Sequence, residues 1–191
     1  MVSSRPTIDV AVIMQRVSNT GAAKHWQPWR WQLADVVLNE DSFGTKPRLL
    51  LDSDSEVRWL HPGFKVQLFP SDAEGFYLNV TTPAPSWFVL WTMEDEPGHA
   101  EEPIPIPLEV SLSYHDAGHW MDGQDTVEQV PAPESVVQWL KAFTDEHYVA
   151  EPKRRKRPES MRSLADRFGS PASVSTGKKR GGGDGSGGGH G

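Results

Sequence analysis

The stretch Ile8-Asp9-Val10-Ala11-Val12-Ile13-Met14-Gln15 decides the fold of this chain, because its apolar residues recur at every second position. The even-numbered positions are all apolar, and the intervening Ala11 and Ile13 are apolar as well. A period of two is typical of a β-strand, and apolar residues on both faces indicate that little of the strand meets solvent. The sequence therefore predicts a strand here that is half-buried or buried on both faces.

Further runs with strand character come after this first one, and turn signals separate them. Pro62-Gly63 is a strong turn signal, and it predicts that one strand ends there and another begins. Short strands at this spacing favour an antiparallel meander over strand–helix–strand units. The runs are Trp29–Leu38, Arg48–Leu51, Val57–Leu60, Phe64–Phe69, Phe76–Val80, Trp87–Met93 and Ile106–Ser113.

Helical patterning begins only after these runs. Tyr114–Met121 is expected to form a single helical turn. Pro133–His147 is the convincing helix, because Val136, Leu140 and Phe143 recur on one face. The predicted fold is mainly β (α+β): a curved antiparallel sheet or partly open barrel of seven to eight strands, with this C-terminal helix packed on it.

Charge divides the 191 residues into unlike parts. Residues 1–150 hold 9 Lys and Arg against 22 Asp and Glu, a net charge of −13, and all 8 Trp. Residues 151–191 hold 10 Lys and Arg against 4 Asp and Glu, a net charge of +6. We expect an acidic Trp-rich β domain at 1–150, a basic segment with a short amphipathic helix at 151–169, and a Gly-rich disordered tail at 170–191.

Composition excludes several classes of protein. With no Cys, the chain has no disulfide framework, Cys zinc site or thiol nucleophile. No apolar run is long enough to span a membrane, and no signal peptide is recognisable, so we expect a cytoplasmic protein. The acidic domain would repel phosphates, so no nucleic-acid partner is expected. The oligomeric state stays open.

The basic run Lys153–Arg157 has three interpretations. It is a solvated spacer, it docks on an acidic partner or on this chain's own acidic domain, or it contacts nucleic acid or anionic lipid. The apolar helical face beyond it favours a segment that folds on a protein partner. The residues assigned to partner binding are Arg154, Arg155, Arg157, Met161, Leu164 and Phe168.

Three other patterns could carry chemistry. His115 and His119 are four residues apart, the spacing of zinc ligands on a helix, and a third ligand such as His61 or Asp122 would be needed. The full His-Glu-x-x-His pattern is absent, so no metal site is assigned. The carboxylate runs, such as Glu101-Glu102, are interpreted as solvated loops rather than catalytic pairs. The Trp residues either pack the core or line an aromatic groove for a peptide or a flat ligand, since Trp29 with Trp31, and Trp87 with Trp91, share a strand face.

Several of these segments together resemble domain of unknown function family 3305, over roughly residues 6–160. The motifs that carry the resemblance are Val10–Arg16, Trp26–Trp31, Leu68-Phe69-Pro70, Asp72–Val80, Pro83-x-Pro85-Ser86-x-Phe88-Val89-Leu90-Trp91, Val110–Tyr114, Glu146-His147-Tyr148 and the basic run after them. The matching Glu74, Tyr77 and Asn79 form either a site or a structural turn. The candidate ligand groove comprises Trp29, Trp31, Tyr77, Asn79, Trp87 and Trp91.

The resemblance implies a bacterial protein encoded beside molybdenum or tungsten formate dehydrogenase genes. Members often carry the label molybdopterin-guanine dinucleotide biosynthesis protein A. We therefore expect a non-enzymatic accessory, assembly or small-subunit protein that binds formate dehydrogenase subunits. The alternatives are a cofactor-handling protein that contacts molybdopterin-guanine dinucleotide without holding it tightly, and the guanylyltransferase of the label. True guanylyltransferases open with a Gly-rich nucleotide loop on a parallel α/β fold, whereas this chain has no Gly before Gly21.

Overall fold

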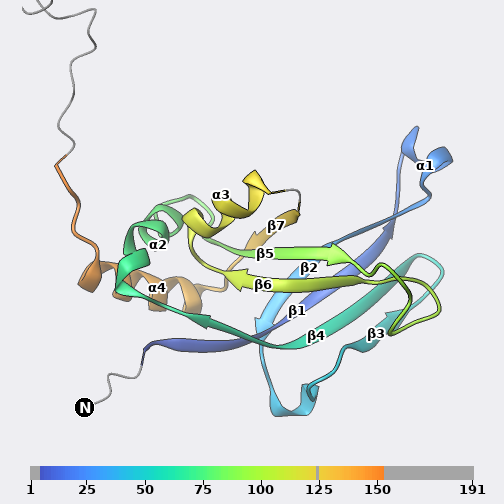
Figure 1. Ribbon diagram of the computed structural model, residues 1–191, viewed down its shortest axis with the longest axis horizontal. Helices are drawn as coiled ribbons and strands as arrows, with labels where there is room; N and C mark the ends of the chain where they lie inside the picture. The colour runs from blue at the N-terminus through green and yellow to red at the C-terminus, as the bar shows by residue number, and fades with distance from the viewer. Residues whose placement is uncertain (1–4, 124, 153–191) are drawn as a thin grey trace, which may run out of the picture. The chain divides into compact units, whose positions relative to one another are not determined.

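The computed structural model describes residues 5–123 and 125–152, so the predicted amphipathic helix and Gly-rich tail lie outside the described residues. The chain divides into units Met1–Val149 and Ala150–Gly191, and the first unit holds every described strand and helix (Figure 1). Its strands are β1 (Thr7–Ser18), β2 (Trp29–Leu38), β3 (Arg48–Asp52), β4 (Glu56–Gln67), β5 (Ser86–Met93), β6 (Pro105–Ser111) and β7 (Thr126–Pro131). Its helices are α1 (Ala23–Trp26), α2 (Ala73–Val80), α3 (Tyr114–Asp122) and α4 (Glu134–His147), with 3-10 turns at Asp41–Phe43 and Pro70–Asp72.

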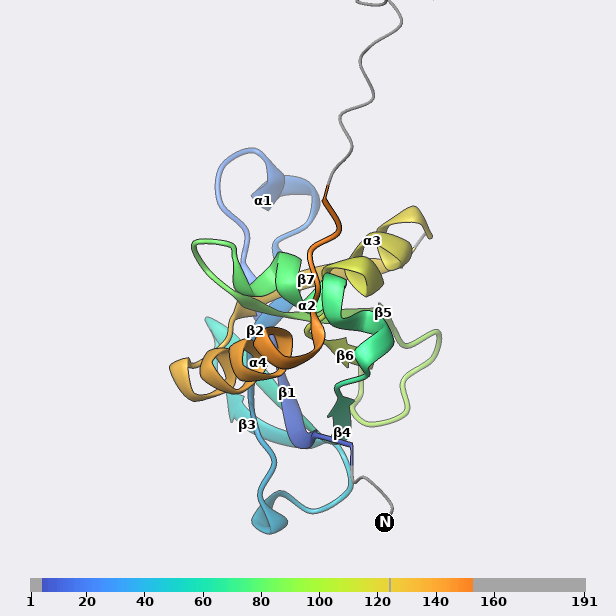
Figure 2. The same ribbon diagram turned by 90° about the vertical axis from the view of Figure 1, so that its left-hand side faces the viewer.

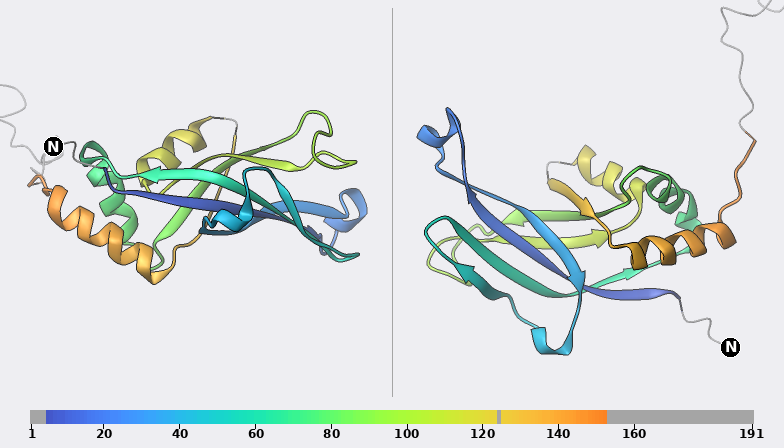
Figure 3. Two further views of the ribbon diagram at one scale, coloured as in Figure 1. Left: turned by 90° about the horizontal axis from the view of Figure 1, so that it is seen from below. Right: turned by 180° about the vertical axis from the view of Figure 1, so that it is seen from behind.

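The strands form two antiparallel sheets rather than one. The first sheet has the order β2-β1-β4-β3, and the second has the order β6-β5-β7. The predicted mainly β, antiparallel architecture is therefore confirmed. The strands divide between two sheets instead of forming the single curved sheet or partly open barrel that the sequence predicts, and no closed barrel forms among the described residues. Figure 3 shows the two sheets from below and from behind.

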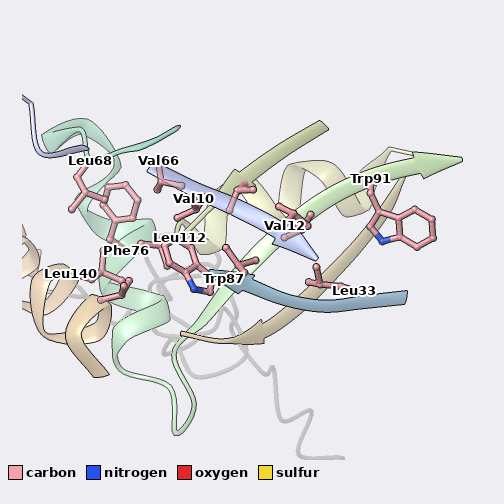
Figure 4. Close-up of a cluster of buried hydrophobic side chains, with 14 of the residues drawn as sticks. Val10, Val12, Leu33, Val66, Leu68, Phe76, Trp87, Trp91, Leu112 and Leu140 are labelled. Carbon is pink, nitrogen blue, oxygen red and sulfur yellow. The ribbon is translucent and has the colours of Figure 1, made fainter. Parts of the chain in front are cut away.

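The hydrophobic core lies between the sheets and continues to the helices at one end. Val10 and Val12 of β1 meet Trp87 and Val89 of β5 in one buried cluster (Figure 4). The burial of Val10, Ala11 and Val12 confirms that β1 is a strand buried on both faces over this stretch. Removal of this apolar surface from water is the main stabilising contribution to a fold of this kind.

Helix α4 closes the end of this core, as predicted. Its buried residues include Val136, Leu140 and Phe143, all of which belong to the core cluster. Helix α2 packs beside it, and the Phe76 ring meets the Phe143 ring edge-on with 5.9 Å between centroids. Figure 2 shows the two helices side by side at this end.

Pro62-Gly63 does not separate two strands, contrary to the prediction. β4 continues from Glu56 to Gln67. In the register against β1, His61 lies opposite Val12 and Phe64 lies opposite Val10. Pro62 and Gly63 therefore both lie opposite the single residue Ala11. Gly63 adopts φ 93°, a conformation that a residue with a side chain rarely takes. The dipeptide therefore forms a β-bulge within one long strand.

Three more elements differ from prediction. Phe76–Val80 belongs to the helix α2 and not to a strand, although its aromatic and β-branched residues favour β structure locally. α3 is a nine-residue helix rather than a single turn. β7 is a strand that the sequence does not predict. Its apolar residues Val127 and Val130 are three positions apart, so they do not show a period of two.

Candidate functional site

A groove of about 480 Å³ opens between the β3–β4 hairpin and the loop that joins β5 to β6. We call it the Trp31–Trp59 groove. Trp59 lies on β4 and is 8% exposed, and Trp31 lies on β2 and is half-buried. Both pack with the buried residues Val57 and Ile104. Its lining is Arg16, Trp31, Leu49, Asp52, Val57, Trp59, His99, Ala100, Glu101, Glu102, Pro103 and Ile104.

Arg16 supplies the cation of the groove. Its guanidinium lies 5.2 Å from the centre of the Trp29 ring and 5.9 Å from that of Trp31. Nη1 also donates to Glu102 Oε2 at 3.2 Å. Arg16 reaches both partners because β1 pairs directly with β2, which places it opposite Trp31. The groove therefore holds a guanidinium between aromatic faces and a carboxylate, a favourable arrangement for a cation.

Carboxylates dominate the rim. Asp52 closes β3, and Glu101 lies beside Glu102 in the β5–β6 loop; all three are exposed. Among the described residues, the side chains of Asp52 and Glu101 make no ion pair. The rim thus carries negative charge beyond what Arg16 compensates, and this potential attracts cations.

Three titratable groups lie next to the groove. His61 on β4 is 4% exposed, and its Nε2 has no hydrogen-bond partner among the described residues. Burial lowers the pKa of His61 to about 4, and repulsion from His99 adds to this while Glu94 opposes it. Burial tends to raise the pKa of Glu94, but hydrogen bonds from His99, Ile104 N–H and Gly98 N–H prevail and lower it. This network anchors the β5–β6 loop.

β3 forms the outer lip of the groove. It stands at the edge of its sheet and pairs only with β4 among the described strands. Every residue of β3 is exposed, including Leu49, Leu50 and Leu51 at 43%, 44% and 40%. An exposed apolar edge strand offers backbone groups and side chains to another chain.

The six residues predicted for a ligand groove do not line one cavity. Trp31 lines the Trp31–Trp59 groove. Trp29 does not line it, but its ring lies against the guanidinium of Arg16, which does. Trp87 and Trp91 are 0% and 8% exposed and belong to the core cluster. Core packing thus explains one Trp pair, while the other lies beside a groove.

Asn79 and Tyr77 lie on α2, and neither of them lines the Trp31–Trp59 groove. Asn79 is 1% exposed; its Nδ2 donates to Ser86 O at 2.9 Å and to Leu112 O at 2.8 Å, while its Oδ1 accepts from Ser86 N–H at 3.0 Å. Tyr77 stacks on Tyr148 with 4.1 Å between ring centroids. Asn79 therefore joins α2 to the ends of β5 and β6.

The other predicted residues divide into two groups. His115 and His119 are both exposed on α3. Within residues 5–123 and 125–152, no three His, Asp or Glu residues are arranged to hold a metal ion. Arg154, Arg155, Arg157, Met161, Leu164 and Phe168 lie outside the described residues.

Sequence reasoning misses most of the groove. It does not single out Trp59 or Arg16, and it interprets the carboxylate runs that contain Asp52 and Glu101-Glu102 as solvated loops. Trp59 carries a usable signal, since Val57 and Trp59 share one face of a strand and the charged Arg58 lies between them on the other face. No local signal shows that the loop with Glu101 folds back over β3 and β4.

Comparison with known proteins gives one match. The family described as Protein of unknown function (DUF3305) matches residues 9–157. No curated protein and no solved structure matches the chain. No helix among the described residues has the length and apolar character needed to cross a membrane.

Proposed function

The chain belongs to the family Protein of unknown function (DUF3305), and from this premise we propose that it is a cytoplasmic, non-enzymatic accessory, assembly or small-subunit protein of a molybdenum or tungsten formate dehydrogenase. It binds the dehydrogenase through its β domain and its basic tail. The proposal takes the dehydrogenase from the family resemblance. It takes the binding role from the Trp31–Trp59 groove and its neighbour β3.

One observation carries the binding role. An aromatic groove with an acidic rim adjoins an edge strand whose Leu49, Leu50 and Leu51 are each at least 40% exposed. Aromatic residues are enriched where proteins bind one another, and contiguous exposed apolar residues mark such surfaces.

Affinity purification from the native host tests this proposal. A tagged full-length chain, purified at moderate salt and analysed by mass spectrometry, is expected to retain formate dehydrogenase subunits in near-stoichiometric amounts. Deletion of residues 153–169 should lower their recovery and leave thermal unfolding of the β domain unchanged. Deletion of residues 181–191 is the matched control and should change neither. Recovery of the chain without dehydrogenase subunits, at both low and moderate salt, would contradict the proposal.

The alternative role, handling of molybdopterin-guanine dinucleotide, also uses the groove, since the half-buried Trp31 lines it and an aromatic ring can stack on a pterin or guanine. It is less well supported, because the carboxylates of Asp52 and Glu101 repel a pyrophosphate. Titration of the dinucleotide against Trp fluorescence distinguishes the two roles. Quenching at micromolar ligand would favour the cofactor role. Guanylyltransferase activity is less favoured still, because every strand pair among the described residues is antiparallel.

A further inference from the structure

The Trp31–Trp59 groove has unmatched negative charge beside apolar surface. Asp52 and Glu101 are exposed, and neither side chain makes an ion pair or hydrogen bond within the described part of the chain. Trp31, Trp59 and Leu49 line the same groove. A side chain that fits such a surface has an apolar stem and a cationic end, as Arg and Lys do.

Arg16 is an example within this chain of a guanidinium bound at this surface. It lies on the Trp29 and Trp31 rings and binds Glu102 at 3.2 Å. Within residues 5–123 and 125–152, the chain therefore supplies a cation for one carboxylate of the rim, Glu102, and none for Asp52 and Glu101. Charge complementarity thus points to a partner that brings a cation of its own.

The edge strand β3 determines how an extended partner segment would be oriented. Leu49 lies opposite Trp59, and Asp52 lies opposite Val57, so these two residues of β3 face the groove. The other edge of β3 pairs with no strand among the described residues. An extended segment that adds to this edge gains backbone hydrogen bonds, and its alternate side chains reach the same face as Leu49 and Asp52.

We infer that β3 and the Trp31–Trp59 groove together bind an extended segment of a partner protein that carries an arginine or a lysine. The segment adds to the sheet as a strand beside β3. Its cationic side chain lies on the aromatic surface of the groove, next to Asp52 and Glu101. The inference deepens the proposed function by naming the chemistry of the partner, and it rests on that function only in taking a protein as the occupant.

Fluorescence anisotropy with a designed probe tests the inference. The probe is a fluorescein-labelled peptide of sequence TVRVRVT, and its counterpart TVEVEVT carries the opposite charge. The full-length chain is expected to bind the arginine peptide and not the glutamate peptide. The double variant Asp52→Asn/Glu101→Gln should weaken binding by about tenfold, which corresponds to two partly exposed ion pairs. The variant Asp122→Asn/Glu146→Gln removes the same charge from exposed positions elsewhere and should bind as the parent does.

Hydrogen exchange locates the contact. Amide exchange of residues 48–52 is expected to slow when the arginine peptide is added. Equal affinities for the two double variants would overturn the inference, since the peptide would then respond to net charge alone. Slowed exchange elsewhere with β3 unchanged would also overturn it. Sedimentation velocity could instead show a concentration-dependent dimer in which the β3 amides are protected before any peptide is added. The free edge of β3 would then bind a second copy of this chain, and the inference of a different partner protein would be overturned.

The two proposals fail separately. If the arginine peptide binds at β3 but no dehydrogenase subunits are recovered, this inference holds and the proposal that the partner is formate dehydrogenase is contradicted. If both double variants recover the dehydrogenase subunits equally well, the proposed function holds. The inference that β3 and the Trp31–Trp59 groove form the binding surface is then contradicted.

Discussion

His61 places an imidazole inside the protein at 4% exposure, with the pKa lowered to about 4 by burial. Its ordinary pKa is 6.5. Between these two values the unfolded chain binds a proton that the folded chain does not bind. Stability therefore rises with pH across this window and is fully present above pH 6.5.

We predict that lowering the pH from 7 to 5 decreases the free energy of unfolding by about 2 kcal/mol through His61 alone. In His61→Gln, the free energy of unfolding should vary less with pH over this range by that amount. Urea unfolding at a series of pH values measures the difference. His25→Gln changes an exposed histidine on α1 and serves as the control, which should keep the parent's pH dependence. Parallel pH curves for the parent and His61→Gln would contradict the prediction.

At the scale of elements, α2 and α3 approach so closely that one position between them excludes a side chain. A Cβ on Gly75 of α2 would lie 2.3 Å from Ser113 Oγ. Ser113 is 1% exposed and caps α3 by accepting a hydrogen bond from Asp116 N–H. The glycine therefore serves helix packing, although glycine ordinarily weakens a helix.

We predict that Gly75→Ala and Gly118→Ala have opposite effects. Gly118 lies on α3 with open space around its Cβ position, so alanine there should stabilise the protein by about 0.5–1 kcal/mol. Gly75→Ala should destabilise by about 1–2 kcal/mol, because Ser113 must move and α3 loses its cap. Chemical denaturation measures both. Adding Ser113→Ala to Gly75→Ala should cost less than the two single changes summed. Stabilisation by Gly75→Ala would refute the packing explanation.

At the scale of the molecule, Glu128 links the two sheets. From β7 it accepts hydrogen bonds from Leu33 N–H of β2 at 3.0 Å and from Trp91 Nε1 of β5 at 2.7 Å. The register between β1 and β2 shifts at Ile13/Met14, next to the Met14↔Leu33 pair. One carboxylate oxygen thus satisfies donors from both sheets, where an unmet donor would weaken their packing.

We predict that Glu128→Ala destabilises the protein by about 2–4 kcal/mol, because two half-buried donors lose their acceptor. Glu128→Gln should cost less, since its amide oxygen can still accept. Glu109→Ala removes an exposed glutamate from β6 and should change stability little. Thermal and urea unfolding of the three variants test the order. A Glu128→Ala variant as stable as Glu109→Ala would show that the sheets do not depend on this link.

The sequence by itself determined the features that depend on local periodicity. The alternation in Ile8–Gln15, the run Trp29–Leu38 and the face of α4 depend on residues a few positions apart, and each element formed as expected. The tertiary structure decided what depends on distant residues. Phe76–Val80 became helical because Phe76 packs against α4, whereas Gly63 let β4 continue through a bulge.

The candidate site belongs to this second class. Trp31 is predicted as part of an aromatic groove, but its neighbours in space come from β1, β3, β4 and the β5–β6 loop. Arg16 and Glu102 are 86 residues apart in the chain and meet only once both sheets are assembled. Local periodicity reports which face of a strand is buried, because that depends on alternating side chains. It cannot report which strand becomes the edge or which loop closes over it, because sheet order is set by packing across the whole core.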